Sequence, residues 1–122
     1  MTSSNTASSA WNTIVAALNR GWLIGCDTGS TSIDGLPGGH AETLLGAYVL
    51  RDTSGNVVAY LYRIRNPWGI DAYNGPWSDN DSRWTSYYKS QVPYVNANDG
   101  YFFMDYSTFL SAYLYFTINF YT

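Results

Sequence analysis

The chain has 122 residues and a formal net charge of -3, so its length fits one domain with one modest core. Hydrophobic residues make up 46% of the chain and charged residues 12%, which excludes an intrinsically disordered protein, and six lysines and arginines are too few for a nucleic-acid footprint. The single cysteine excludes an intramolecular disulfide, and no cluster of cysteine and histidine residues suits zinc.

The first residues carry no targeting signal. Residues 1–9 lack the basic start and the apolar core of a signal peptide, and no apolar run reaches the roughly 18 residues that a membrane span needs. We therefore expect a soluble protein of the reducing cytoplasm, with no membrane partner and no nucleic-acid partner. Residues 1–8 are interpreted as a flexible tail or linker, and residues 9–122 as the folded domain.

A helix is the first predicted element. Ser8 or Ser9 can cap it, its apolar residues Trp11, Ile14, Val15 and Leu18 fall on one face, and Gly21 ends it. The apolar residues 22–26 then predict a short buried strand. Residues 27–39 are rich in glycine, serine and threonine and predict a loop.

A β-hairpin is the clearest element of the sequence. Residues 44–50 are apolar, residues 52–56 carry turn chemistry, and residues 57–64 are rich in β-branched and aromatic side chains. If the chain reverses at Ser54, position 40 comes to lie opposite a residue within a few places of 66. The only histidine, His40, is therefore expected to meet the carboxamide of Asn66 at the open end of the hairpin.

The second half of the chain predicts shorter elements. Residues 69–91 mix large aromatic rings with Asp, Asn, Ser and Gly, which is typical of irregular structure held by the rings, and residues 79–82 can cap a short helix at 83–88. Residues 93–99 form a turn region, 101–104 a strand, 107–112 a helix capped by Ser107, and 114–120 a strand. The expected fold is α+β, a mainly antiparallel β-sheet with a few short flanking helices.

The expected pairing of His40 with Asn66 has a chemical meaning. A histidine held by an asparagine is two thirds of a thiol-protease triad, in which the asparagine orients the ring and the ring acts as base and then as acid. The nucleophile is missing. Cys26 ends an apolar strand and precedes Asp27, whose charge opposes thiolate formation, so we interpret Cys26 as a buried structural thiol.

Several motifs in a fixed order resemble a known family. The chain resembles the second half-domain of the calpain protease core, the β-rich half of a papain-like cysteine protease that bears histidine and asparagine. The most specific part is Arg65-Asn66-Pro67-Trp68-Gly69 followed by Gly75-Pro76-Trp77-Ser78-Asp79. The other matching stretches are Arg20-Gly21-Trp22-Leu23-Ile24-Gly25-Cys26, Gly38-Gly39-His40-Ala41, Tyr62-Arg63-Ile64 and Asp99-Gly100-Tyr101-Phe102-Phe103-Met104.

The resemblance implies a divided active site. His40 and Asn66 would be catalytic residues, Trp68 would cover their hydrogen bond, and a Cys-bearing half-domain would supply the nucleophile. The implied activity is that of an intracellular endopeptidase that hydrolyses polypeptide substrates, and this chain alone is expected to be inactive. The resemblance also implies that loop 27–39 borders the substrate cleft.

The family's calcium site is only partly matched. By resemblance, the ligands would include Asp79 and Asp99, with Asp71 beside the position of an expected acidic residue that is Ala72 here. Tyr101 replaces a later glutamate. Calcium prefers six to eight oxygen ligands, so we expect weak or no calcium binding.

Two other functions remain open at this stage. The chain can belong to a non-catalytic relative, in which a protease-like half serves as an interaction or regulatory module. The 18% aromatic content also suits a surface that binds carbohydrate or peptide, or one that docks on another protein.

Overall fold

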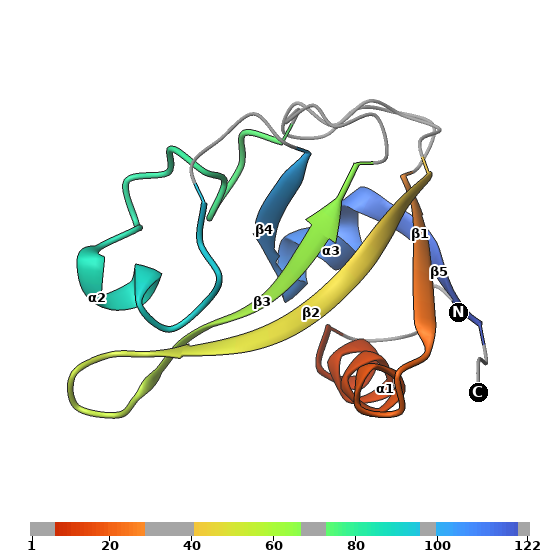
Figure 1. The fold of residues 1–122 in the computed structure, drawn as a ribbon, viewed down its shortest axis with the longest axis horizontal. Coiled ribbons are helices and arrows are strands. Elements are labelled where there is room, and N and C mark those ends of the chain that lie inside the picture. The colour runs from red at the N-terminus through yellow and green to blue at the C-terminus, as the bar shows by residue number, and fades with distance from the viewer. Residues whose placement is uncertain (1–6, 29–40, 67–72, 96–99, 120–122) are drawn as a thin grey trace.

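The structure is a computed structural model that describes residues 7–28, 41–66, 73–95 and 100–119. Its elements in chain order are α1 (Ala7–Asn19), β1 (Leu23–Thr28), β2 (Ala41–Arg51), β3 (Val57–Arg65), α2 (Ser86–Lys89), β4 (Tyr101–Asp105), α3 (Tyr106–Ala112) and β5 (Tyr113–Asn119). The strands form an antiparallel five-stranded sheet in the order β4-β3-β2-β1-β5 (Figure 1). The predicted α+β fold with short flanking helices is confirmed.

The predicted hairpin is formed by β2 and β3. Its turn is held by Asp52, whose carboxylate accepts hydrogen bonds of 2.9 Å from the backbone N–H groups of Ser54 and Asn56. Gly55 has a φ of 87°, which favours glycine. Strand β2 begins at Ala41, three residues earlier than predicted. The hairpin therefore extends to the residue that directly follows His40 in the sequence.

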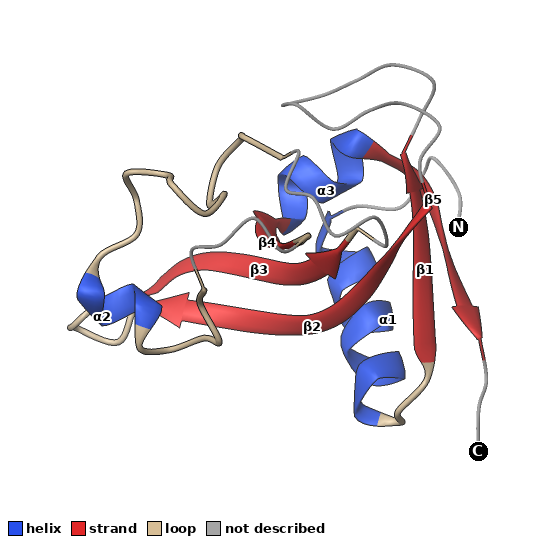
Figure 2. Ribbon diagram, turned by 45° about the horizontal axis from the view of Figure 1, so that its top comes forward, coloured by secondary structure: helices blue, strands red, loops and turns tan. Residues whose placement is uncertain are grey.

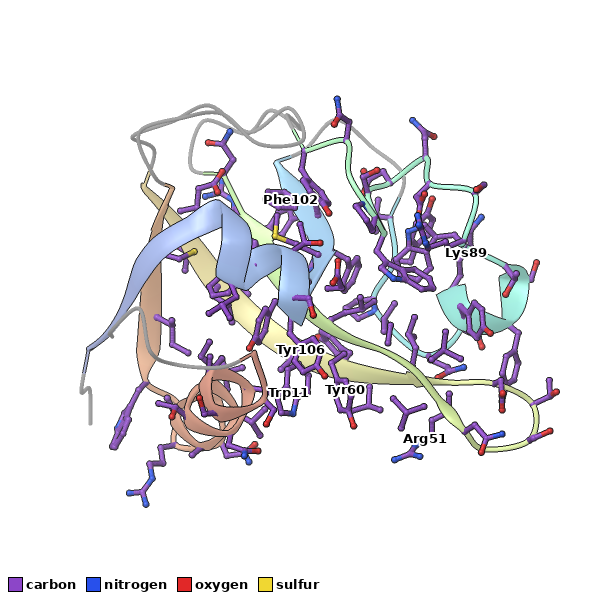
Figure 3. The ribbon with its side chains drawn as sticks, turned by 180° about the vertical axis from the view of Figure 1, so that it is seen from behind. Trp11, Arg51, Tyr60, Lys89, Phe102 and Tyr106 are labelled. Atoms are coloured by element: carbon purple, nitrogen blue, oxygen red, sulfur yellow. The ribbon has the colours of Figure 1, made fainter. Side chains whose placement is uncertain are left out.

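One face of the sheet is covered by α1 and α3, which Figure 2 shows on the same side. Trp11 of α1 lies against Tyr60 of β3 and Tyr106 of α3, with ring centroids 5.2 and 6.1 Å apart (Figure 3). The fully buried residues of this core come from α1, α3 and strands β1 to β4. They include Ile14, Ile24, Cys26, Leu44, Tyr62, Ile64, Phe102, Met104 and Phe109. Their burial removes apolar surface from water and so stabilises this face.

The end of α1 agrees with the sequence. Gly21 has a φ of 74°, its N–H donates to the carbonyl of Leu18 at 3.0 Å, and the N–H of Trp22 donates to the carbonyl of Ala17 at 3.1 Å. This is a Schellman motif, which needs a left-handed residue after the last helical turn. No helix in the described ranges is long and apolar enough to span a bilayer.

Residues 77–94 cover part of the other face of the sheet, whereas Tyr73 packs on Phe102 in the helix-covered core. Trp77 and Trp84 meet edge to face at 5.0 Å, and Trp84 also contacts Phe103 of β4 at 5.5 Å. The indole N–H of Trp84 donates to the carbonyls of Trp77 and Ser78, at 3.2 and 3.0 Å. The prediction of irregular structure held by large rings at 69–91 is thus confirmed for residues 73–91, and residues 69–72 lie outside the described residues.

The predicted helix caps were wrong. Helix α1 begins at Ala7, ahead of Ser8 and Ser9. Helix α2 is capped by Thr85, whose hydroxyl accepts from the N–H of Tyr88 at 3.2 Å, and not by residues 79–82. Helix α3 is capped by Asp105, which accepts from the N–H of Thr108 at 3.2 Å, in place of Ser107.

Candidate active site

A row of residues crosses the sheet at the open end of the hairpin. Cys26 of β1 pairs with Glu42 of β2, and Thr43 of β2 pairs with Arg65 of β3. One step further along the same register, Glu42 is level with Asn66. The N–H of Asn66 donates to the carbonyl of Gly100, just before β4, at 2.9 Å. The row therefore runs Cys26, Glu42, Asn66, Gly100.

The side chains of this row lie on the helix-covered face. Ile64 and Tyr62 belong to the core on that face, and because strand side chains alternate, Asn66 shares their side. Cys26, Glu42 and Asn66 are 1%, 3% and 3% exposed. A buried carboxyl group and a buried carboxamide thus occur at the open end of the hairpin, where the sequence predicts the candidate active site.

Of the predicted catalytic residues, the described part of the chain contains only Asn66. His40 and Trp68 lie outside the described residues, as do residues 29–39 of the predicted loop 27–39. The first two residues of that prediction were wrong, because β1 continues through Thr28 and pairs there with β5. Asn66 directly follows β3, and its backbone is tied to the start of β4. This position fixes the backbone of the asparagine at the open end of the hairpin.

Cys26 lies deep in the core. Its thiol donates a 3.5 Å hydrogen bond to the backbone carbonyl of Glu42, and only 1% of the residue is exposed. A nucleophilic thiolate must reach a substrate carbonyl and is favoured by nearby cations. Burial beside a glutamate offers neither condition, so the position of Cys26 suits a structural thiol.

Glu42 was missed by the sequence analysis. It is the only glutamate of the chain and stands two residues after the only histidine. Apolar residues and glycine fill most of the following strand, so a charged residue at a core-facing position was a signal that alternation alone could have exposed. The hairpin register then brings it level with Asn66.

Of the predicted calcium ligands, only Asp79 lies among the described residues. Asp71 and Asp99, with Ala72, lie outside the described residues. The backbone carbonyl of Asp79 accepts a hydrogen bond from the hydroxyl of Tyr94. Across the residues that the structure describes, no group of three potential metal-binding side chains is found.

Two arginine side chains lie against the ring of Tyr101. The guanidinium carbons of Arg63 and Arg65 lie 4.4 and 5.5 Å from the centre of its ring. These contacts are cation–π interactions, in which the face of the ring attracts positive charge. Two guanidinium groups therefore lie against the residue that, by resemblance, replaces a calcium-binding glutamate.

A separate cavity of about 420 Å³ lies away from the Cys26–Asn66 row. It is bordered by the first residues of β3, by Trp77, and by Asp105 and Tyr106 at the junction of β4 and α3. None of the residues that line it belongs to the row. The cavity is therefore distinct from the candidate active site.

Comparisons with known proteins identify the family. A family model described as calpain family cysteine protease matches residues 1–119. The calpain-1 catalytic subunit of Rattus norvegicus is 32% identical over 111 residues, and that of Bos taurus is 36% identical over 114 residues; each match covers 84% of this chain and 16% of the relative. Calpain-14 of Homo sapiens is 39% identical over 77 residues, which cover 61% of this chain and 11% of that protein.

The chain thus spans only a small part of the length of these relatives. The matched share of the chain is nevertheless large, and the match reaches across all five strands of the sheet. On this ground, the chain belongs to the calpain family of cysteine proteases.

Proposed function

We propose that this chain is the His/Asn-bearing half of a calpain-like cysteine endopeptidase core. The observation that supports this proposal most directly is the place of Asn66, buried at the open end of the β2–β3 hairpin, with β2 beginning one residue after His40. Two strands that pair in register keep their ends together, so the start of β2, which follows His40 in the sequence, lies beside the end of β3, which precedes Asn66. A partner half-domain then supplies the nucleophilic cysteine and an oxyanion-hole donor.

In this proposal Asn66 orients the ring of His40. Its carboxamide oxygen accepts a hydrogen bond from one N–H of the His40 ring, which fixes the tautomer and leaves the other nitrogen to face the partner's thiol. His40 takes the thiol proton, the thiolate attacks the carbonyl carbon of the scissile peptide bond, and the resulting imidazolium protonates the leaving amine. Water then hydrolyses the acyl-enzyme with His40 as base.

Trp68 is proposed to cover the His40–Asn66 hydrogen bond. A hydrogen bond shielded from water is electrostatically stronger, because the surrounding dielectric is lower. A well-shielded pair keeps the ring in one orientation between turnovers. Proximity of this kind lowers the barrier because fewer orientations must be sampled.

The partner half-domain is needed because Cys26 is unsuited to attack. With 1% exposure, its thiol has no path to a polypeptide substrate. The isolated chain is therefore proposed to be inactive. A buried reduced thiol also suits the reducing cytoplasm, which we propose as the location of the protein.

Calcium is proposed to bind this half weakly or not at all. Asp79, Asp99 and Asp71 provide at most three carboxylates, and Tyr101 with its two stacked arginines stands where the family has another. Calcium requires a larger set of oxygen ligands. Any activity of the complete protein is therefore proposed to be independent of calcium at this site.

A second candidate function is a non-catalytic regulatory module. The observation that favours it is the same loss of carboxylates around Tyr101, since an inactive relative has no need for a calcium switch. Retention of both His40 and Asn66 favours the protease. The sequence encoded upstream of Met1 discriminates between them: a glutamine followed by Cys-Trp at the start of a helix indicates an enzyme.

Complementation tests the proposed protease. The chain is combined with a Cys-bearing calpain half-domain, and hydrolysis of a fluorogenic peptide is measured. Activity that requires both parts, is lost in His40→Ala, falls in Asn66→Ala and persists in Cys26→Ala supports the proposal. Hydrolysis by the isolated chain, or by the complemented His40→Ala variant, overturns it.

A further inference from the structure

We infer that Arg63 and Arg65 form a binding site for a carboxylate group of another polypeptide segment. Both residues alternate along β3 with the core residues Tyr62 and Ile64, so they lie on the face of the sheet opposite the helices. Carboxylate binding here is separate from the proposed proteolysis and does not require it. Three features of the molecule support the site: a pair of like charges, two buried donors and a nearby hydroxyl group.

The first feature is that Arg63 and Arg65 share one aromatic ring. Their guanidinium carbons lie 4.4 and 5.5 Å from the ring centre of Tyr101, which pairs with Arg65 across β3 and β4. Two like charges at one ring repel each other, and attraction to the ring offsets only a part of this repulsion. The one ion pair among the described residues joins Arg83 to Asp81. An anion bound at the two arginines of β3 would therefore supply a missing negative charge.

The second feature is a pair of donors without acceptors. Both arginine side chains are half-buried, and their Nε atoms are buried without a hydrogen-bond partner among the described residues. A buried N–H that lacks an acceptor destabilises a fold. The Nε–H and a terminal N–H of a guanidinium group form a fork that matches the two oxygens of a carboxylate. A bound carboxylate can thus satisfy donors that the described chain leaves unpaired.

The third feature is a tyrosine hydroxyl beside the arginines. Gly46 of β2 is the cross-strand partner of Arg63, and a Cβ atom on Gly46 would lie 2.9 Å from the hydroxyl oxygen of Tyr48. Paired residues direct their side chains to the same face of a sheet, so this hydroxyl lies over Gly46 on the face of the arginines. A hydroxyl group can donate to an anion. Glycine at position 46 therefore leaves room for a further donor next to Arg63.

The class of ligand follows from the charges and from the family. Guanidinium groups bind carboxylates and phosphates, and the anionic side chains of polypeptides are carboxylates. In the proposed enzyme, a polypeptide substrate and the partner half-domain both approach the open end of the sheet. Either of them can carry the acidic side chain that reaches Arg63 and Arg65.

The first experiment measures binding of a blocked peptide with two glutamates to the intact 122-residue chain. The Nε–H signals of Arg63 and Arg65 are followed by nuclear magnetic resonance, and the same peptide with two glutamines is the control ligand. We expect a saturable shift with the glutamate peptide alone, and weaker binding as sodium chloride is added. Equal shifts with both peptides, or no saturable shift, overturn the inference. Binding of inorganic phosphate without binding of the glutamate peptide also overturns it.

The second experiment repeats this titration with single variants. Arg63→Gln and Arg65→Gln should each weaken binding about tenfold, because each removes a charged donor. The matched control is Arg20→Gln, since Arg20 also stacks on an aromatic ring, Trp22, at 5.1 Å, but has no second arginine on that ring. Arg20→Gln should leave the affinity unchanged. An equal loss in all three variants would assign the effect to overall charge and overturn the inference.

Position 101 offers a test by internal competition. Tyr101→Glu introduces a carboxylate directly across from Arg65 and should prevent binding of the glutamate peptide, whereas Tyr101→Phe keeps the ring and should keep the affinity. If Tyr101→Glu does not fold, the two arginine variants decide. Asp71 and Asp99 lie outside the described residues. If either carboxylate already occupies the arginine pair, the peptide does not bind the unmodified chain, and the inference is overturned.

The source of the carboxylate is identified in the complemented enzyme. A substrate source predicts that kcat/KM is higher for a glutamate-containing peptide than for its glutamine analogue, and that Arg65→Gln removes this preference. A partner source predicts that Arg65→Gln weakens association of the two halves and affects both peptides equally. If neither quantity changes, both sources are excluded and the inference is overturned. A complemented pair without activity contradicts the proposed function, whereas the titration of the intact chain still decides the carboxylate site.

Discussion

Cys26 and Glu42, the only cysteine and the only glutamate of the chain, are cross-strand partners in β1 and β2, joined by a thiol-to-carbonyl hydrogen bond of 3.5 Å. A thiol in this position should react with a soluble thiol reagent only when the domain opens. We expect Cys26→Ala to lower the free energy of unfolding by about 1–2 kcal/mol, because removal of the buried sulfur atom leaves a small cavity. Rapid labelling of the folded chain would contradict this burial.

Tyr62 is buried without a partner for its hydroxyl among the described residues. Its ring packs on Phe109 and Trp11, at centroid distances of 4.7 and 5.3 Å, so the ring and not the hydroxyl stabilises the core. Leaving a buried hydroxyl unsatisfied costs about 1–3 kcal/mol. Tyr62→Phe should therefore keep or raise the urea midpoint, whereas a large drop would indicate a hydrogen bond to this hydroxyl.

Tyr62 should also make the stability of the folded domain sensitive to alkaline pH. Burial, with a smaller contribution from Tyr106, raises the pKa of the Tyr62 phenol far above its usual value. In the unfolded chain this phenol ionises near pH 10, and in the folded chain it stays neutral, so stability is lost as pH rises beyond about 10. Relative to Tyr62→Phe, the wild-type chain should lose about 1.4 kcal/mol per pH unit there, measured by urea unfolding at several pH values. Parallel pH profiles would contradict the burial.

Asp81 holds the turn that carries Trp77. Its carboxylate accepts from the N–H of Trp77 at 2.8 Å and pairs with Arg83 at 2.9 Å, while Trp77 has a left-handed φ of 67°. Burial alone would raise the pKa of Asp81, but the hydrogen bonds from Trp77 and Arg83 outweigh it and the pKa is lowered. The stabilisation is thus present above about pH 4 and is lost as pH falls through the lowered pKa.

We expect Asp81→Ala to destabilise the domain by about 1–2 kcal/mol, since a hydrogen bond to a charged group is lost at a strained residue. Tryptophan fluorescence during urea unfolding measures this change, because Trp77 and Trp84 pack together beside the turn. Arg83→Gln is the matched control, since it removes the exposed partner of the ion pair and keeps the Trp77 bond. Equal losses in both variants would assign the effect to the ion pair.

The sequence predicted the sheet better than the helix ends. Strong alternation and the turn chemistry at 52–56 specify the hairpin, because a shift by one residue would move Tyr62 and Ile64 out of the core. Caps are less specific, because many serines and aspartates can accept a backbone hydrogen bond. The choice of Thr85 over residues 79–82 depends on Asp81 being engaged by Trp77, a contact that local sequence does not reveal.

The candidate site was predicted in part for the same reason. The hairpin placed Asn66 at the open end from sequence alone, and the register supports that position. Glu42 was missed because its position depends on two strand registers. It pairs with Cys26 of β1, and it lies level with Asn66 at the end of β3. A cross-strand row becomes visible only when the strand order and both registers are known.

Calcium should leave the chain unchanged. The ring of Tyr101 contacts the guanidinium groups of Arg63 and Arg65, at a position where calcium binding would need a carboxylate. We expect neither tryptophan fluorescence nor melting temperature to respond saturably to calcium, because metal binding to the folded state alone would raise its stability. A saturable titration with micromolar affinity would contradict this prediction, and magnesium at equal ionic strength is the control.

The pairing of His40 with Asn66 gives the last prediction. The chain has one histidine, so its ring signals are identified without ambiguity. Asn66→Ala removes the carboxamide that is proposed to fix the ring, and we expect the His40 resonances to shift more than in any distant surface variant. Val95→Ala is a suitable control, because Val95 is 52% exposed and lies outside the sheet.

Indistinguishable His40 spectra in Asn66→Ala and Val95→Ala would mean that the two side chains do not interact. The activity of the complemented enzyme should follow the spectra, with kcat reduced and KM little changed, because orientation of the ring matters in the transition state more than in substrate binding. A rise in KM at constant kcat would instead place Asn66 in substrate binding. The asparagine would then shape the cleft without serving the histidine.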